Sequence, residues 1–578
     1  MRDAAISLQT GRVMARAWAD ELRDDRRLSA VRVFITEAVQ AYIEASGTQV
    51  EISQPDLPLT YILDTSAVEL AHTLGRAAAS VALENACYEL SATYTAMLPG
   101  DIRTAWGAFY TPPALTERLL TLAVEAGTDW RTARVLDPAC GGGAFLLPVA
   151  FKMRDALPGL HAEQLLEHFR NHLHGFEIDP FAAWLTRTWL QIAFSEETGA
   201  ATAPFPEVIE VCNSLDQLPK GEGYDLVIGN PPYGRIKLPA NQRTLYARSL
   251  FGHANLYGVF TDIALRWTRK GGVIAYVTPT SFLGGEYFKA LRGLLATEAP
   301  PIAFDFVTAR KGVFDGVLQE TMLSTYRKGG RQQAADVHFL MLNGTASVTH
   351  AGRFALPAKG SDPWLAPRTP ADNALVQNLE LMDARLSDWG YTVSTGPLVW
   401  NRFKDQFRAR SGKDTLPVIW AEAVTADGRF LFRAEKRNHQ PYFRPVPADE
   451  WLKVSTPCVL LQRTTAKEQA RRLIAAELPE SFIKAHGGVI VENHLNMIRP
   501  IVKNPPVSPS VVAAILNSNI IDRAFRCISG SVAVSAFELE AIPLPRPEEL
   551  TEVAALVAAG AGRDLVDQCL EALFLEAR

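Results

Sequence analysis

The sequence predicts an α/β fold in which helices cover both faces of a parallel sheet. Between about residues 101 and 350, short apolar runs alternate with glycine-rich turns and helical stretches. This alternation is typical of parallel sheets, whose crossover helices lie on the two faces. The chain has 578 residues, of which 48% are hydrophobic and 21% are charged. These are ordinary values for a globular protein, and the length suffices for several domains.

Four apolar runs are expected to form strands of this sheet. They are ARVLD (133–137), HGFEID (174–179), YDLVIG (224–229) and GGVIAYVTP (271–279). In such sheets, ligands bind outside the carboxyl ends of the strands. The motifs whose side chains could bind a ligand or take part in catalysis follow directly after these strands. We therefore expect them to meet at one edge of the sheet.

The two flanking regions differ from this central part. Residues 1–100 space their apolar residues three and four apart, which predicts a helical N-terminal extension. The extension holds 8 Lys and Arg against 13 Asp and Glu and no catalytic motif, so we interpret it as a packing layer on the domain at 101–350. Residues 351–578 mix short β-like runs with loops and end in a helix, which predicts a separate α+β domain. Within it, residues 401–480 carry 15 Lys and Arg against 10 Asp and Glu, a local excess that suits a solvated surface or a nucleic-acid face.

Composition favours the cytoplasm. The six cysteines lie far apart without a C-x-x-C pair, which argues against a disulfide framework. The N-terminus lacks the apolar core of a signal peptide, and no apolar run is long enough to cross a membrane. His168, His172 and His174 are close in sequence, but we assign them to a solvated surface and expect no metal.

The first motif is a glycine turn that follows the first strand, Asp137-Pro138-Ala139-Cys140-Gly141-Gly142-Gly143. Glycines let the backbone turn sharply and approach a ligand closely. Asp137 before the turn would repel a pyrophosphate but suits a cationic ligand. Glu177, at the end of the next strand, can accept hydrogen bonds from ribose hydroxyls. The pair fits S-adenosylmethionine better than NAD or ATP.

The second motif is Asn230-Pro231-Pro232-Tyr233, directly after the third strand. The Asn230 amide oxygen and the Pro231 carbonyl would offer two acceptors from a stiff loop, and these suit an amino group with two protons. Two such hydrogen bonds can draw an aromatic amine toward tetrahedral geometry, so that its lone pair can attack a methyl group. Tyr233 supplies a ring on which a base can stack.

Together these motifs resemble the gamma class (TaqI type) of N6-adenine DNA methyltransferases of restriction-modification systems. The segments at 107–120, 255–260, 271–279 and 312–323 resemble further motifs of that class, in the same order. The resemblance implies a Rossmann-like sheet that binds S-adenosylmethionine, followed by a target-recognition domain. Segments at 455–465, 492–500, 513–520 and 536–547 resemble that second domain.

The resemblance also implies roles for single residues. Asn230, Pro231, Pro232 and Tyr233 would form the catalytic loop, with Tyr233 and Phe314 stacking on the target base. Thr111, Asp137, Ala139, Gly141 and Glu177 would bind the cofactor. Either Asn213 or Asp216 would contact the adenine of the cofactor, and the sequence leaves that choice open.

The implied activity is methyl transfer to the N6 amino group of a flipped adenine in double-stranded DNA. The implied partner is a separately encoded cognate restriction endonuclease, with the enzyme itself a monomer. Alternative acceptors are an RNA base, a protein glutamine or cytosine N4, and a fused restriction-modification enzyme is a further alternative. Cytosine-N4 enzymes more often carry Ser at the position of Asn230, and the residues 1–100 show no convincing nuclease motif.

Overall fold

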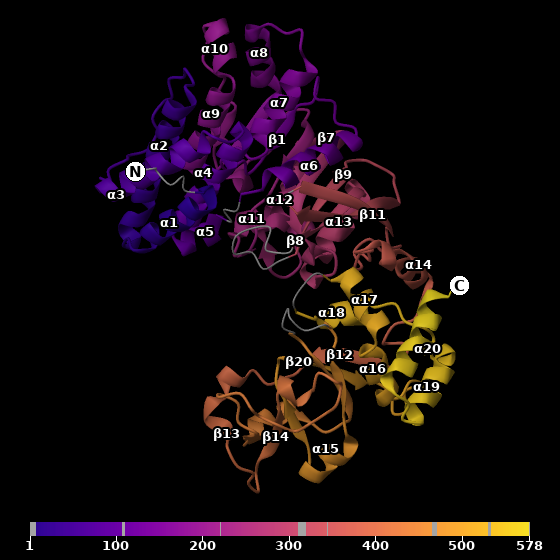
Figure 1. Cartoon of the computed structure of the whole chain (residues 1–578). Helices are drawn as coiled ribbons and strands as arrows, with labels where there is room; N and C mark the ends of the chain where they lie inside the picture. The colour runs from indigo at the N-terminus through magenta and orange to yellow at the C-terminus, as the bar shows by residue number, and fades with distance from the viewer. Residues whose placement is uncertain are drawn as a thin grey trace. The chain divides into compact units, whose positions relative to one another are not determined.

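The computed structural model describes residues 7–106, 110–219, 221–309, 320–343, 345–464, 471–529 and 533–576 (Figure 1). The chain divides into two compact units. The N-terminal unit comprises Met1–Pro279 and Ala290–Thr349, and the C-terminal unit comprises Thr280–Lys289 and His350–Arg578. The division of the chain into domains 1–100, 101–350 and 351–578 stays a prediction.

The N-terminal extension is helical, as its apolar spacing predicts. Asp64 caps one helix by accepting a hydrogen bond from the Ala67 N–H, and Gly47 ends another in the left-handed conformation (φ 70°). The extension shares one continuous hydrophobic core with the sheet, to which Phe34 and Leu90 of the extension and Leu226 of the sheet all belong. Its helices are α1 (Leu8–Asp20), α2 (Asp24–Ser46), α3 (Thr65–Ala78), α4 (Leu83–Met97) and α5 (Gly100–Trp106).

The main sheet confirms the predicted α/β fold but is not wholly parallel. Its strand order is β11-β10-β8-β9-β7-β4-β1-β2-β3. The strands are β1 (Val135–Asp137), β2 (Leu173–Glu177), β3 (Ile209–Val211), β4 (Tyr224–Gly229), β7 (Thr268–Pro279), β8 (Pro301–Ala309), β9 (Thr321–Arg327), β10 (Ala334–Asn343) and β11 (Thr345–Ala355). Strand β9 runs antiparallel to both of its neighbours, β7 and β8. The four runs expected to form strands became β1, β2, β4 and β7, and these pair in parallel as predicted, whereas β9 was not among the predicted strands.

Helices of the N-terminal unit connect the strands of this sheet. They are α6 (Pro113–Glu125), α7 (Leu146–Ala156), α8 (Ala162–His172), α9 (Pro180–Ala193), α10 (Ser195–Ala201), α11 (Ala240–Leu245), α12 (Leu256–Trp267) and α13 (Lys289–Glu298). A small two-stranded sheet, β5 (Arg235–Ile236) and β6 (Ala254–Asn255), lies between β4 and α12 in sequence. Strands β1, β2 and β4 pair in parallel, so their carboxyl ends lie at one edge.

The C-terminal unit has mixed α and β structure, as predicted. One sheet has the order β12-β20-β17-β18 and the other β13-β15-β14-β19-β16. Its strands are β12 (Tyr391–Thr395), β13 (Phe407–Arg408), β14 (Leu416–Ile419), β15 (Tyr442–Phe443), β16 (Lys453–Val454), β17 (Cys458–Gln462), β18 (Ala475–Leu478), β19 (Val489–Val491) and β20 (Leu495–Pro500). Its helices are α14 (Asn373–Leu381), α15 (Glu480–His486), α16 (Pro509–Leu516), α17 (Asn519–Ile528), α18 (Ala536–Glu540), α19 (Thr551–Ala558) and α20 (Arg563–Leu575). Among the described residues, no helix is both long and apolar enough to span a bilayer.

Candidate functional site

The glycine turn after β1 has a conformation that needs glycine. Gly141 and Gly143 have positive φ angles of 54° and 92°. Gly142 has no room for a side chain, because a Cβ atom there would lie 2.5 Å from the Ser91 Oγ atom of α4. Two side chains hold the carbonyls of the turn: the Thr186 hydroxyl donates to the Gly141 oxygen (2.6 Å) and the Cys87 thiol to the Gly142 oxygen (3.3 Å). The turn is therefore fixed from α9 on one side and from α4 on the other.

Glu177 lies at the end of β2, next to this turn. Its carboxylate accepts one hydrogen bond from the Gly141 N–H (2.8 Å) and another from the Asp179 N–H (2.9 Å). The residue is only 9% exposed, and burial raises the pKa of Glu177 to about 7. A carboxylate held in this way is preorganised to accept hydrogen bonds from a ligand's hydroxyl groups.

Asp179, two residues further on, is a site residue that the sequence analysis did not select. Its carboxylate caps α9 by accepting from the Phe181 N–H (3.1 Å). Tyr94 of α4 donates its hydroxyl to one carboxylate oxygen (2.5 Å), and Arg32 of α2 donates to the other (2.7 Å). Asp179 could have been selected from the sequence, because it is the second carboxylate in HGFEID (174–179). Nothing in the sequence indicated that Tyr94 or Arg32 contacts it.

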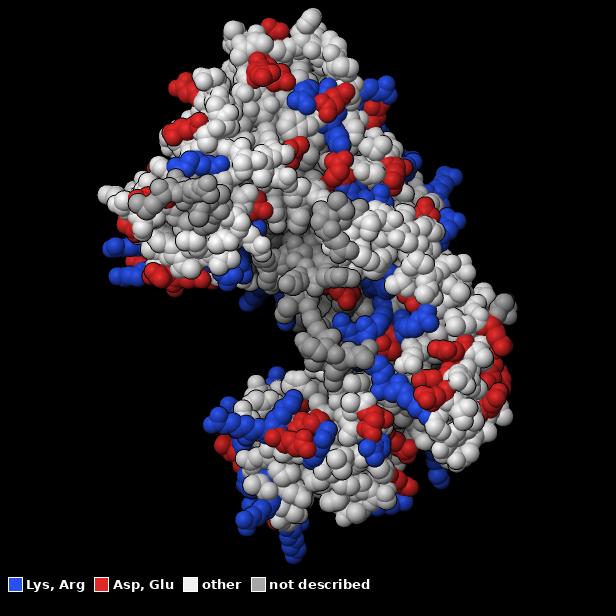
Figure 2. All heavy atoms as spheres, viewed as in Figure 1, with Lys and Arg blue, Asp and Glu red and all other residues white. Residues whose placement is uncertain are grey.

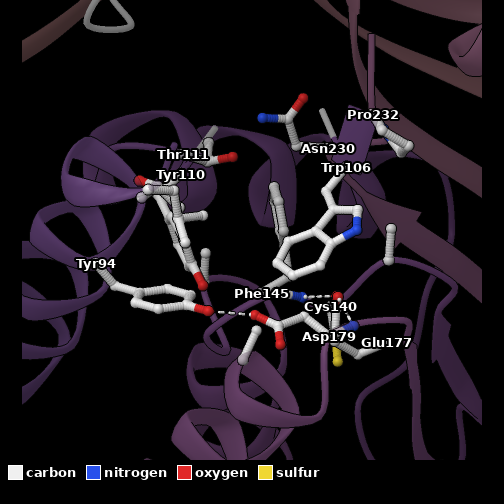
Figure 3. Close-up of a pocket in the computed structure, with 16 residues that line it drawn as sticks. Tyr94, Trp106, Tyr110, Thr111, Cys140, Phe145, Glu177, Asp179, Asn230 and Pro232 are labelled. Carbon is white, nitrogen blue, oxygen red and sulfur yellow. Dashed lines mark hydrogen bonds between the residues drawn. The ribbon is translucent and has the colours of Figure 1, made fainter. Parts of the chain in front are cut away.

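These groups border one cavity at the carboxyl ends of β1, β2 and β4 (Figure 3). It encloses about 600 Å³, part of which is open to solvent. In Figure 3 the ring of Trp106 and the side chain of Asn230 lie on one side, and the rings of Tyr94 and Tyr110 lie on another. The lining residues are Tyr94, Thr95, Leu98, Trp106, Tyr110, Thr111, Ala139, Cys140, Gly141, Ala144, Phe145, Glu177, Asp179, Ala182, Asn230 and Pro232. The cavity therefore brings the two sequence motifs together, with a wall from the helical extension.

The loop after β4 contributes Asn230 and Pro232 to this cavity. Tyr233 is 8% exposed, and its ring meets that of Tyr257 edge-on with centroids 6.1 Å apart. Its hydroxyl has two acceptors within reach, the Asn230 Oδ1 atom at 2.7 Å and the Val277 carbonyl at 3.2 Å, and the shorter contact is the one to Asn230. In this position the hydroxyl orients the Asn230 amide, and the ring offers little surface to an incoming base. The stacking role of Tyr233 stays a prediction.

The other predicted cofactor residues take different positions. Ala139, Gly141 and Thr111 line the cavity, and the buried Thr111 Oγ1 atom has no hydrogen-bond partner within the described ranges. Asp137 is not among the lining residues. It is 1% exposed, it accepts from the Ala139 N–H (3.0 Å), and burial raises the pKa of Asp137 to about 8. Because it is mostly protonated at neutral pH, Asp137 is poorly suited to attract a cation in the unliganded protein.

Asn213 and Asp216 follow β3 and contact each other. The Asn213 amide donates to one Asp216 oxygen (2.8 Å), and Gln242 donates to the other (2.7 Å). Neither residue lines the cavity, so the structure leaves open which of them contacts a cofactor. Phe314 lies outside the described residues, and its role stays a prediction.

Neither a cysteine nucleophile nor a histidine metal site is supported by the residues around this cavity. Burial raises the pKa of the Cys140 thiol well above its usual range, the opposite of what a nucleophile needs. His168 and His174 are half-buried, and burial lowers the pKa of each to about 4. The expected solvated surface is therefore only partly correct, because His168 and His172 on α8 and His174 within β2 are all partly buried. No group of three metal-binding side chains occurs among the residues that the structure describes.

Comparison with known proteins finds similarity to methylases of restriction-modification systems. The Eco57I restriction-modification methylase family matches residues 171–314, which include Glu177 and the Asn230 loop. Over these residues the chain is similar to restriction-modification methylases. It is 26% identical over 503 residues to the type II methyltransferase M.BsuBI of Bacillus subtilis, covering 82% of this chain and 94% of the relative. It is 26% identical over 343 residues to M.PstI of Providencia stuartii, covering 57% of this chain and 67% of the relative.

A solved structure supports the fold. The type IIL restriction-modification enzyme MmeI, determined in complex with DNA, superposes with a TM-score of 0.54 at 12% identity. The match covers 99% of this chain and 97% of that protein. At this identity the similarity concerns the fold alone, and it extends over both units.

The similarity to methylases indicates S-adenosylmethionine as the cofactor, and the cavity fits it. Gly141 of the glycine turn lines the cavity with a positive φ of 54°, where a residue without a Cβ atom lets the backbone approach a ligand closely. The buried Thr111 hydroxyl has no partner among the described residues, so it can bond a polar group of the cofactor. The Glu177 carboxylate suits the ribose hydroxyls of the cofactor. Glu177 and Asp179, the two carboxylates that line the cavity, suit a ligand that carries a sulfonium charge.

Proposed function

We propose that this protein transfers a methyl group from S-adenosylmethionine to the N6 amino group of adenine in double-stranded DNA. The observation that carries the proposal is that Asn230 and Pro232 line the same cavity as the glycine turn and Glu177. A donor bound by the turn and by Glu177 would therefore meet an amino group bound at Asn230. The type II methyltransferases among the relatives support this reaction class.

The protein's part in the reaction is to bind and orient the amino group. The Asn230 amide oxygen and the Pro231 carbonyl would each accept one of its hydrogens, which stabilises the amine as it becomes tetrahedral. An amide oxygen has two lone pairs, so accepting from the Tyr233 hydroxyl does not by itself exclude a second donor. The methyl group is supplied on the sulfonium of bound S-adenosylmethionine. Because the amino group of a stacked base cannot reach such a cavity, the adenine would be flipped out of the duplex.

The DNA-binding surface is proposed to lie in the C-terminal unit, on the part built from residues 401–444. Exposed Lys and Arg side chains gather in the loops around β13, β14 and β15, and Figure 2 shows blue side chains on this unit. The exposed cations are Arg402, Lys404, Arg410, Lys413, Arg429, Lys436, Arg437 and Arg444. Such residues would neutralise backbone phosphates and make binding steeply salt-dependent. The biological role is proposed to be protection of host DNA from a separately encoded cognate endonuclease.

The acceptor class can be tested directly with the full-length protein. Labelled S-adenosylmethionine is supplied with plasmid DNA, bulk RNA or a protein mixture, and the label in each polymer is counted. We expect transfer to DNA, and loss of that transfer in the Asn230→Ala variant. Transfer to RNA or protein in preference to DNA would contradict the proposal.

A further inference from the structure

The N-terminal helices contact the candidate cofactor site at several points. Tyr94, Thr95 and Leu98, at the end of α4, line the cavity directly. Earlier on the same helix, the Cys87 thiol donates to the Gly142 carbonyl, and Ser91 lies where a Cβ atom of residue 142 would be. The extension is therefore one wall of the cofactor cavity, which is more than the packing layer expected from its sequence.

The strongest of these contacts converge on Asp179. Its carboxylate is almost completely buried, with 3% of the side chain exposed, and it receives three hydrogen bonds. Two come from the extension: the Arg32 guanidinium bonds one oxygen at 2.7 Å and the Tyr94 hydroxyl bonds the other at 2.5 Å. The third comes from the Phe181 N–H at the start of α9. A buried carboxylate with both oxygens bonded in this way has little freedom to move.

The backbone of Asp179 carries this restraint to Glu177. The Asp179 N–H donates to one oxygen of the Glu177 carboxylate, and the Gly141 N–H of the glycine turn donates to the other. If Asp179 shifted, Glu177 would lose one of the two bonds that set its direction. The chain of contacts therefore runs from α2 and α4, through Asp179, to the carboxylate that would hold the cofactor's ribose.

We infer that Arg32 and Tyr94 are positioning residues for cofactor binding, which act by fixing Asp179 and, through its backbone N–H, the carboxylate of Glu177. The inference rests on the proposed function only in taking this cavity as the S-adenosylmethionine site. Arg32 is not among the residues that line the cavity, so its effect on the cofactor must pass through Asp179.

Equilibrium binding of S-adenosylmethionine to the full-length chain, measured by calorimetry without DNA, tests this inference. Tyr94→Phe removes the hydroxyl but keeps the ring, which packs against Phe181 with centroids 4.9 Å apart. We expect the dissociation constant of Tyr94→Phe to rise about three- to tenfold, which is less than the loss of a charge-assisted hydrogen bond to the cofactor itself would give, because the lost bond acts on the cofactor only through Asp179 and Glu177. The matched control is Tyr42→Phe, because Tyr42 is buried in the same extension against Trp189 and lies outside the Asp179 network. Its affinity should equal that of the wild type.

A second pair of variants tests Arg32. Arg32→Lys retains a positive donor, so its affinity should lie between that of the wild type and that of Arg32→Ala. Removing the Tyr94 hydroxyl leaves one oxygen of the buried Asp179 carboxylate without this hydrogen bond, so the melting temperature of unliganded Tyr94→Phe should fall below that of Tyr42→Phe.

Tyr94→Phe binding that is no weaker than Tyr42→Phe binding would overturn the inference, whether or not Arg32→Ala folds. A loss of melting temperature in Tyr94→Phe with an unchanged dissociation constant would also overturn it, since the network would then be merely structural. A wild-type chain that binds S-adenosylmethionine but methylates no DNA would contradict the proposed function. The binding comparison would still decide the inference in that case.

Discussion

The raised pKa of Glu177 predicts that cofactor affinity increases with pH. Burial raises the pKa of this carboxyl to about 7, so the side chain is mostly protonated at pH 6 and mostly ionised at pH 8. The ionised form is the better acceptor for ribose hydroxyls and attracts the sulfonium cation, so S-adenosylmethionine should bind more tightly at the higher pH. Because other groups also titrate, the informative quantity is the ratio of the dissociation constants of Glu177→Gln and the wild type.

The size of this effect follows from the pKa. At pH 6 only about one molecule in eleven carries an ionised Glu177 if its pKa is about 7. A charge-assisted hydrogen bond contributes about 1.5–3 kcal/mol, or roughly ten- to a hundredfold in affinity. The ratio of Glu177→Gln to wild-type dissociation constants should therefore increase about five- to tenfold between pH 6 and pH 8.

Calorimetric titrations of both proteins at pH 6, 7 and 8 measure this ratio. Glutamine cannot ionise, so Glu177→Gln serves as the reference at each pH and removes the contribution of the cofactor's own amino group. A ratio that stays constant across this range would refute the reasoning. It would mean either that Glu177 does not titrate near pH 7 or that its charge does not act on the cofactor.

Three further predictions concern catalysis and DNA binding. Asn230→Ala should lower the single-turnover methylation rate by about 100-fold or more, with cofactor affinity nearly unchanged; a rate within a few-fold of the wild type would exclude the catalytic role. Tyr233→Phe should lower that rate about tenfold, because the hydroxyl orients the Asn230 amide; an unchanged rate would favour the stacking role instead. The double variant Lys436→Ala/Arg437→Ala should weaken DNA binding and reduce the slope of log affinity against log salt by about one per lost phosphate contact. An unchanged slope would place the phosphate contacts elsewhere.

The sequence predicted the strands that carry motifs better than it predicted the rest of the sheet. Strands β1, β2, β4 and β7 occur where apolar runs precede a turn or a loop. Strand β3 is as short as β1, but two of its three residues, Glu210 and Val211, are exposed, so no buried apolar run marks it in the sequence. The antiparallel direction of β9 depends on its neighbours in space, which hydrophobic spacing does not encode.

The site was predictable where its residues are neighbours in sequence. The glycine turn, Glu177 and the Asn230 loop are local motifs, and the structure brings them to one cavity. Tyr94 and Arg32 could not be found in this way, since they lie 85 and 147 positions from Asp179. The charge of Asp137 could not be predicted from the sequence for another reason. Burial in the folded chain raises the pKa of Asp137 to about 8, and the sequence does not show that burial.

The central claim is that the methyl acceptor is the N6 amino group of adenine, and nucleoside analysis of the methylated product tests it most directly. Plasmid DNA is incubated with the full-length protein and labelled S-adenosylmethionine, digested to nucleosides and separated by chromatography. The account predicts that the label co-elutes with N6-methyldeoxyadenosine and is absent when Asn230→Ala replaces the wild type. Label in N4-methyldeoxycytidine, or in no nucleoside of the DNA, would contradict it.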